Sequence, residues 1–240
     1  GEYLKAFMQK QSGESDRLLA QWQVGANDDP ETKNAAHQLG NQFSDAFYSA
    51  VTEAIEQIEH EATRQGVASK LFATTLLFAV VRQQDNKTFI SSFWVGDGAI
   101  AVYGKDRVRL MGKPDGGEFA GQTRFLDYGC LVRDFKQRVH IGYFDDAQAV
   151  ILMTDGISDP RFETDAGLEN QQKWQALWQE IEPHLQQEQP EQALLEWSAF
   201  FSAGHHDDRT LAILWTVSTS SIHDSSMVTE PVEINGEEHE

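Results

Sequence analysis

The sequence predicts an α+β protein in which helices and antiparallel strands form separate packed layers. Apolar residues recur three or four positions apart over roughly residues 33–64, which is typical of a long amphipathic helix. From residue 71 the pattern changes to strand-like runs, and their short connections favour antiparallel neighbours over helical crossovers. Helical patterns return over residues 171–201, and an apolar run at residues 210–217 follows them. Helices, a block of strands, more helices and a closing strand together indicate the α+β class.

Local signals predict the N-terminal helices. An amphipathic pattern predicts a short helix at residues 2–11, which Ser12 and Gly13 are expected to end. A second short helix is expected at residues 17–24, followed by a loop. Gly66 is expected to stop the long helix, because glycine readily adopts the conformation that ends helices. The apolar stripe of that helix is interpreted as core packing and consists of Phe43, Phe47, Val51, Ile55 and Ile58.

The middle of the chain is expected to supply most of the strands. An Asp-Asn turn at residues 85–86 separates the first long strand from the second. A glycine-rich loop at residues 113–123 precedes a further expected hairpin, formed by the fifth and sixth strands. The expected strands cover residues 71–81, 88–95, 99–103, 108–111, 138–143, 149–154 and 210–217, and the later helices cover residues 171–185 and 191–201.

Length and composition predict one folded domain. With 240 residues and a hydrophobic content of 40%, the chain is long and apolar enough to bury a sizeable core. We expect this domain to span residues 1–217. Residues 218–240 are rich in Ser and Thr and then acidic, without Lys or Arg, so we expect a disordered tail.

Charge and cysteine content limit the partners and the compartment. A net charge of −19 argues against nucleic acid as the main partner. No apolar run is long enough to cross a bilayer, and no secretory leader opens the chain, so a membrane is not expected either. Cys130 is the only cysteine, which excludes an intrachain disulfide and favours a cytoplasmic location.

Three aspartates stand at the ends of strand-like runs. Asp155 ends an apolar run and precedes Gly156, and Asp97 ends another and precedes Gly98. Asp207 lies just before the last strand. Carboxylates gathered in this way repel one another, so that one takes up a proton unless a cation binds between them. Their oxygen ligands suit Mg²⁺ or Mn²⁺. The alternative is that the Asp-Gly pairs are ordinary turn residues, and the residues alone leave both interpretations open.

The order of short motifs along the chain resembles one known family. The motifs are FATT at residues 72–75, VGDG at 95–98, MTDG at 153–156 and DDRT at 207–210. This order resembles the metal-dependent Ser/Thr protein phosphatases of the PP2C (PPM) type, whose pattern is TT or CT, GDS, SDG and DNxT. The loop GEFAGQTRFL at residues 117–126 resembles the GEYxNxTxFL loop of the compact bacterial branch.

The resemblance implies a fold and a reaction. The fold would be a four-layer αββα sandwich of two antiparallel sheets flanked by helices. The reaction would be hydrolysis of phosphoserine or phosphothreonine in signalling proteins by a water that bridges two or more Mn²⁺ or Mg²⁺ ions. Asp155 and Asp207 match catalytic metal ligands, and Asp97 matches an acid near an accessory metal. The positions that match supporting residues are Thr74, Gly156 and Asp208.

The chain also departs from the family pattern. Gly98 stands where the family has Ser, and Asp208 stands where it has Asn. The family's opening strands carry a DGxGG segment whose Asp bridges both metals, and no such segment precedes Gly1. The sequence therefore resembles the family without its N-terminal hairpin. We therefore expect the parent protein to be a phosphatase and this chain alone to be weakly active or inactive. The reason is that a carboxylate between two dications contributes strongly to their binding, and this chain lacks the one that the family has.

Two other functions compete with this hypothesis. The missing segment and Gly98 favour a pseudophosphatase that binds a partner, such as a kinase, without turnover. The third possibility is an acidic α+β protein whose Asp-Gly turns are purely structural. The phosphatase hypothesis implies a phosphoprotein substrate and a cognate Ser/Thr kinase as partners. It also requires Asp155 and Asp207 to lie close together.

Overall fold

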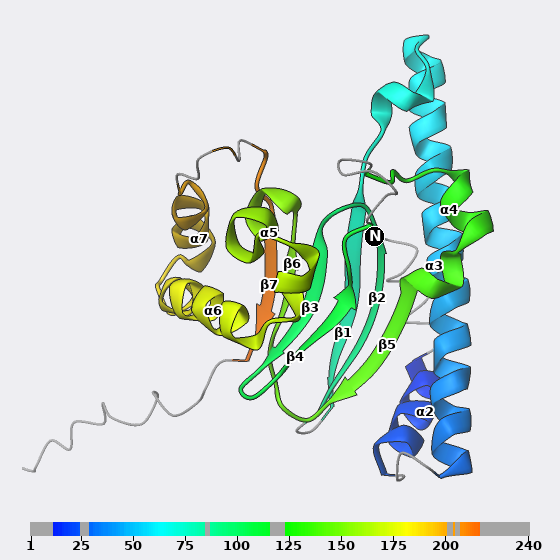
Figure 1. The fold of residues 1–240 in the computed structure, drawn as a ribbon. Coiled ribbons are helices and arrows are strands. Elements are labelled where there is room, and N and C mark those ends of the chain that lie inside the picture. The colour runs from blue at the N-terminus through cyan, green and yellow to red at the C-terminus, as the bar shows by residue number, and fades with distance from the viewer. Residues whose placement is uncertain are drawn as a thin grey trace, which may run out of the picture.

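The protein is a sandwich of two antiparallel sheets with helices on both outer faces (Figure 1). The computed structural model describes residues 12–24, 29–84, 87–115, 123–200, 204 and 207–216. The predicted α+β class and the layers of helix, sheet, sheet and helix are confirmed. Within these residues, no helix has both the length and the apolar character needed to cross a bilayer.

The chain passes back and forth between the two sheets as it adds strands to each of them. The first sheet has the strand order β1-β2-β5, and the second has the order β4-β3-β6-β7. The first comprises β1 (Leu76–Gln84), β2 (Lys87–Val95) and β5 (Val139–Phe144), and the second comprises β3 (Ala99–Gly104), β4 (Val108–Gly112), β6 (Ala147–Met153) and β7 (Leu211–Trp215).

The helices form the two outer layers. On the side of the first sheet lie α2 (Ser12–Val24), α3 (Pro30–Gln65) and α4 (Tyr128–Arg133), with short 3-10 turns η1 (Ser69–Phe72) and η2 (Phe135–Arg138). On the side of the second sheet lie α5 (Asp155–Phe162), η3 (Asp165–Glu169), α6 (Gln171–Leu185) and α7 (Pro190–Ser198).

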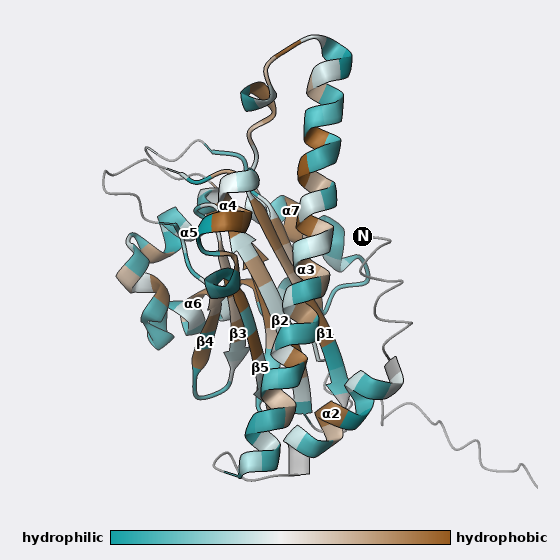
Figure 2. Cartoon of the chain, turned by 90° about the vertical axis from the view of Figure 1, so that its right-hand side faces the viewer, coloured by the Kyte–Doolittle hydropathy of each residue, from teal (hydrophilic) through white to brown (hydrophobic). Residues whose placement is uncertain are grey.

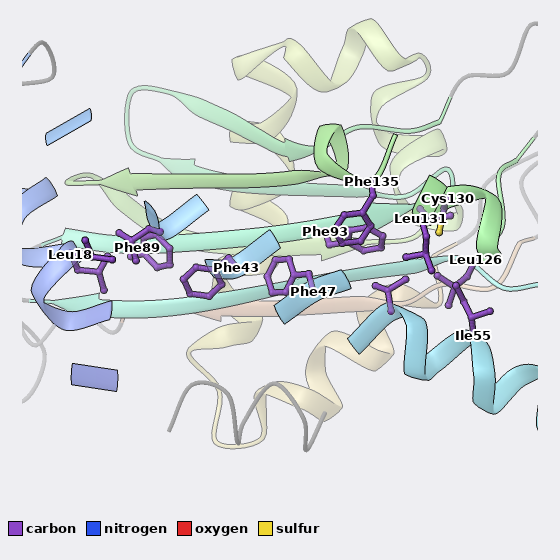
Figure 3. Close-up of a cluster of buried hydrophobic side chains, with 14 of the residues drawn as sticks. Leu18, Phe43, Phe47, Ile55, Phe89, Phe93, Leu126, Cys130, Leu131 and Phe135 are labelled. Carbon is purple, nitrogen blue, oxygen red and sulfur yellow. The ribbon is translucent and has the colours of Figure 1, made fainter. Parts of the chain in front are cut away.

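The long helix α3 begins and ends at recognisable capping residues. The Asp29 side chain accepts a hydrogen bond from the Thr32 backbone N–H at 2.9 Å, and Pro30 occupies the first turn. Gly66 ends the helix with φ +68°, a conformation that L side chains rarely adopt. Its apolar stripe packs on the first sheet, where Phe43 lies 5.1 Å from Phe89 between ring centroids (Figure 3). The predicted role of this stripe in the core is confirmed.

Apolar residues fill all three interfaces between the four layers. One cluster joins α2, α3 and α4 to the first sheet, a second lies between the sheets, and a third joins the second sheet to α5, α6 and α7. Strand alternation explains how one strand serves two interfaces: Phe78 of β1 packs toward α3, whereas Leu77 packs between the sheets. In Figure 2 the strands behind α3 are accordingly largely hydrophobic.

Three sequence-based expectations about elements were wrong. The first strand begins at Leu76 and not at residue 71, because its pairing starts opposite Val95, the last residue of β2. Leu71 is 69% exposed, so the apolar run before Leu76 contributes little to the core. Ser12 and Gly13 do not break a helix but lie in the first turn of α2, where both residues are well tolerated. The helix expected at residues 2–11 and the tail expected at 218–240 lie outside the described residues.

The third error concerns the expected hairpin at residues 138–143 and 149–154. The two strands belong to different sheets: β5 pairs with β2, and β6 pairs with β3 and β7. The connection at Asp145 and Asp146 crosses from one layer to the other. The link between β2 and β3 crosses in the same way, so a short connection here does not make neighbours of the strands it joins.

Candidate active site

Asp97 lies on the link that crosses from β2 in the first sheet to β3 in the second. Gly96 has φ +118°, and a Cβ there would lie 2.4 Å from Thr75 Cγ2. A Cβ on Gly98 would lie 2.6 Å from the Met153 carbonyl oxygen. The two glycines therefore let the link pass tightly between the start of β1 and the end of β6. This close passage brings Asp97 beside the segment that carries Asp155.

Asp155 is the first residue of α5, directly after β6. The residue before it, Thr154, fixes this junction to the entry of β7: its hydroxyl donates to the Asp208 carbonyl at 3.2 Å and accepts from the Thr210 N–H at 2.9 Å. The Asp155 carboxylate accepts a hydrogen bond from the Gly156 N–H at 2.8 Å. The end of β6 and the segment that carries Asp207 are thus held side by side.

Gly156 allows this close approach because it has no side chain. A Cβ at this position would lie 2.5 Å from the carbonyl oxygen of Asp208 and 2.9 Å from that of Asp207. The family resemblance implied a supporting role for Gly156. The structure shows a helical glycine whose free space is filled by the backbone of residues 207 and 208.

The electrostatics of Asp155 show that the three aspartates are close enough to interact. Burial raises the pKa of Asp155, and the neighbouring charges of Asp97 and then Asp207 raise it further, against the lowering effect of the Gly156 N–H bond. Asp159 adds a smaller effect in the same direction. The condition that Asp155 and Asp207 lie near each other is therefore met. Their roles as metal ligands stay a prediction.

The three aspartate side chains have the right chemistry for a hard divalent cation, but they are not grouped as a metal site usually is. All three side chains are carboxylates, the ligands that Mg²⁺ and Mn²⁺ prefer, and a cation would relieve their repulsion. In the part of the chain that the structure describes, however, no three His, Cys, Asp or Glu residues are grouped closely enough to hold a metal. Mg²⁺ keeps several waters and is often bound by only one or two carboxylates, so the prediction requires Asp155 and one of its neighbours and not all three.

The predicted supporting residues contact the site through the backbone more than through their side chains. The Thr74 hydroxyl donates to the Thr75 carbonyl at 3.1 Å, and it is Thr75 that lies against the Gly96 link. The Thr74 carbonyl accepts the Leu126 N–H at 2.8 Å. Asp208 is exposed and contacts Thr154 through its carbonyl oxygen. The supporting roles of Thr74 and Asp208 side chains stay predictions.

Two side chains that hold the site together, those of Arg209 and Thr123, were not among the residues predicted from the sequence. The Arg209 guanidinium donates to the Gly156 carbonyl at 3.1 Å and to the Ser198 carbonyl at 2.8 Å, and so joins β7 to α5 and α7. The hydroxyl of Thr123 donates to the Asp97 carboxylate. Arg209 stands in the DDRT motif, which was its only signal. The only signal for Thr123 was its place in the loop GEFAGQTRFL, where it matches the T of the GEYxNxTxFL pattern.

A largely buried network of ion pairs holds the link between β2 and β3, which carries Asp97, in place. Asp115 accepts the Gly96 N–H at 2.8 Å and a bond from Arg138 at 2.8 Å. Arg138 also donates to Asp134. Its hydrogen bonds lower the pKa of Asp134 to about 2, against the effect of burial and with help from Arg124. Burial opposes the charged form of Arg138, but its bonds to both aspartates outweigh burial and raise its pKa above the usual value.

Comparisons with known proteins agree with the motif order. Residues 1–198 match the family model described as protein phosphatase 2C. Comparison with curated proteins gave no match.

Solved structures similar to the chain include three bacterial phosphatases. A bacterial serine phosphatase carrying a point substitution is 17% identical, with 80% of this chain and 72% of that one covered and a TM-score of 0.39. Serine/threonine phosphatase Stp1 of Staphylococcus aureus is 16% identical over 81% of this chain and 72% of its own, with a TM-score of 0.37. The phosphatase domain of SpoIIE, a cell fate determinant of Bacillus subtilis, is 14% identical over 74% and 75%, with a TM-score of 0.31.

Proposed function

Because the chain belongs to the protein phosphatase 2C family, we propose that it is a weakly active phosphatase that hydrolyses phosphoserine and phosphothreonine esters in proteins and depends on Mn²⁺ or Mg²⁺. The observation that carries this proposal is the meeting of Asp97, Asp155 and Asp207 at one end of the sandwich, from three separate strand ends. The partners proposed with it are a phosphoprotein substrate and a cognate Ser/Thr kinase, and the proposed compartment is the cytoplasm.

The side chains would hold the cation by charge and by fixed position. Asp155 is the main candidate ligand because it is half-buried, next to two other carboxylates and anchored at the start of α5. A bound dication supplies positive charge that acidifies a coordinated water and polarises a phosphoryl oxygen. Thr154, Gly156 and Arg209 keep the strand ends in register, and Thr123 orients Asp97. Asp207 is exposed, so its side is open to a phosphoester that arrives from solvent.

Phosphate release from p-nitrophenyl phosphate and from a phosphothreonine peptide tests this proposal. We expect release with Mn²⁺ and none after chelation, and Asp155→Asn should lower kcat/KM by roughly 10²-fold or more, as for loss of a charged group that stabilises the transition state. Asp106→Asn is the control, because Asp106 is an exposed acid in the turn between β3 and β4. Equal activity of wild type and Asp155→Asn would contradict the proposal.

A partner-binding pseudophosphatase is the second candidate. The observation in its favour is that the carboxylates among the described residues are near each other without forming a group able to hold a metal. Under this alternative, a phosphopeptide binds equally well with chelator present, and no phosphate is released at any Mn²⁺ concentration. Phosphate release that disappears in Asp155→Asn would exclude it.

A further inference from the structure

A hollow beside the sheets lies on the opposite side from β1 and β7. Its volume is about 590 Å³, and its walls include residues 109–111 of β4 and residues 140–144 of β5. Each of these strands is the last in its sheet, β4 in the second and β5 in the first (Figure 1). Their outer backbone N–H and C=O groups therefore have no neighbouring strand in either sheet, which is the arrangement that accepts an extended peptide.

On β4, strand alternation turns a cationic side chain toward the space between the sheets. Val108 and Leu110 pack against the layer of α6 and α7. Arg109 and Met111 therefore belong to the opposite face, and Met111 does lie in the cluster between the sheets. A charged arginine side chain that faces the space between two sheets would cost free energy if other groups buried it without a partner. Arg109 is exposed, so the sandwich is open at this edge.

On β5, two of the inward positions carry a polar residue and a glycine. Ile141 and Tyr143 pack toward α3, which places His140 and Gly142 on the inner face. His140 lies against the Trp94 ring at 4.8 Å between centroids. Gly142 has no side chain, and a Cβ there would lie 2.5 Å from the Phe144 ring. The Phe144 ring therefore fills the space beside Gly142, and His140 is the polar side chain that β5 contributes to this wall of the hollow.

The hollow is cationic on a strongly acidic protein. Three basic residues, Lys87, Arg107 and Arg109, and one acidic residue, Asp145, line it, whereas the chain has a net charge of −19. Arg107 is paired with Asp145 and Asp146. Arg109 has no hydrogen-bond or ion-pair partner among residues 12–24, 29–84, 87–115, 123–200, 204 and 207–216. Its charge is therefore available to a ligand, and the ligand that complements it is an anion.

The hollow leads toward the aspartates. The wall of the hollow at Met111 is joined to β2, since the Ser92 hydroxyl donates a hydrogen bond to the Met111 carbonyl at 2.6 Å. From Met111 the chain continues to Asp115, which binds both the N–H and the carbonyl of Gly96, the residue before Asp97. A peptide lying along β4 or β5 would thus run toward the end of the sandwich where Asp97 and Asp155 meet.

We propose that the hollow between β4 and β5 binds an extended acidic segment of a protein substrate, with carboxylate side chains at Arg109 and main-chain hydrogen bonds along a free strand edge. The substrate part of this inference rests on the proposed phosphatase function, whereas the binding part does not. The class of substrate that follows is phosphoproteins with Glu or Asp residues near the phosphorylated residue.

Direct binding tests the inference without requiring turnover. Fluorescence anisotropy would compare a labelled, unphosphorylated peptide of alternating Glu and Val with the same peptide carrying Gln for Glu. We expect Arg109→Glu to raise the Kd of the Glu peptide about fivefold or more, as for a charge facing its complement at an interface. Added salt should weaken binding in wild type. Arg109→Lys should retain most of the affinity, and thermal unfolding would check that each variant is folded.

The control reverses a charge elsewhere. Arg133→Glu alters an exposed arginine on α4, outside the hollow, and should leave the Kd unchanged. The inference is overturned if wild type does not prefer the Glu peptide, if both reversals weaken binding equally, or if a single-stranded oligonucleotide displaces the peptide at lower concentration than the peptide itself.

Kinetics separate this inference from the proposed function. Arg109→Glu should raise KM for a phosphopeptide flanked by Glu and leave kcat/KM for p-nitrophenyl phosphate unchanged. If both substrates are hydrolysed and Arg109→Glu leaves KM for the phosphopeptide unchanged, the peptide-binding inference is overturned and the phosphatase function stands. Peptide binding that depends on Arg109, with no hydrolysis of either substrate, overturns the phosphatase function and leaves the binding surface standing.

Discussion

Asp155 combines two properties that conflict in a folded protein. It must be ionised to bind a cation, yet burial and the charges of Asp97 and Asp207 disfavour its ionised form. In the metal-free protein this conflict reduces stability. If Asp155 holds a dication as proposed, the bound ion would favour the ionised carboxylate and remove this conflict.

Removing this charge should stabilise the metal-free protein. Since the pKa of Asp155 is higher in the folded than in the unfolded state, its favourable contribution is complete below the unfolded pKa and is lost as pH rises through the folded pKa. We therefore expect Asp155→Asn to have a larger free energy of unfolding than wild type at pH 7 with chelator present. The difference should shrink toward pH 4 and below, measured by urea denaturation. A less stable variant at pH 7 would contradict the prediction.

Gly156 tests the close packing of the site. In Gly156→Ala the new Cβ meets two backbone carbonyl oxygens, which cannot move aside as a side chain can. We expect a loss of about 1–3 kcal/mol in the free energy of unfolding, typical of overpacking, and a parallel loss of activity. Gly40→Ala is the control within α3, since its Cβ would make only an ordinary contact at 3.5 Å with Ile141. Removing a helical glycine should make that control neutral or up to about 1 kcal/mol more stable.

At the scale of elements, segments with a strong repeat were predictable and their layer assignment was not. The boundaries of α3 and α6 and the positions of β2, β3 and β4 follow from periodicity and from Gly66. Periodicity says nothing about which sheet a strand joins, so β5 and β6 were assigned to one hairpin. The short helix α5 was also missed, because its first turn overlaps the Asp-Gly pair and Pro160 lies within it.

The η2 turn and the loop after β4 are joined by Arg138, and this junction should respond to acid. The pKa of Asp134 is about 2, mainly through its hydrogen bonds with Arg138, so its stabilising effect is present above the unfolded pKa and lost as pH falls through the folded one. A shift from about 3.9 in the unfolded state corresponds to roughly 2–3 kcal/mol at pH 7. We expect Asp134→Asn to be destabilised by at least this amount at pH 7, because it also weakens the pairing of a buried arginine.

Urea denaturation from pH 7 to pH 2 measures this effect. The difference between wild type and Asp134→Asn should be constant near neutrality and should decrease between about pH 5 and pH 2. Asp106→Asn, at an exposed turn, should track wild type over the whole range. A difference between wild type and Asp134→Asn that stays constant down to pH 2 would show that the lowered pKa is not the cause.

At the scale of the whole molecule, the sequence indicated which aspartates form the candidate site but not which contacts hold them in position. Asp97, Asp155 and Asp207 could be chosen because each ends a strand-like run, and the motif order placed them together. The contacts that position them join residues far apart in the chain, such as Arg209 to Gly156 and Arg138 to Asp115. Such contacts depend on how the two sheets stack, which local sequence does not encode. The cationic hollow escaped notice for the same reason, since Arg109 looks like any exposed strand residue until its face is known.

The placement of the aspartates predicts that a bound ion would stabilise both sheets at once. Asp97 lies on the link that leaves the first sheet, whereas Asp155 and Asp207 belong to strand ends of the second. An ion held between them would add a bond across the sandwich, so Mn²⁺ should raise the free energy of unfolding as a whole, by about 2.7 kcal/mol at 100 times the Kd. Calorimetry with Mn²⁺ and with chelator measures the shift. It should be largely lost in Asp155→Asn, whose metal-free form is expected to be the more stable one, and retained in Asp106→Asn. Equal Mn²⁺ shifts in wild type and Asp155→Asn would show that Asp155 does not hold the ion, and would contradict the proposed site.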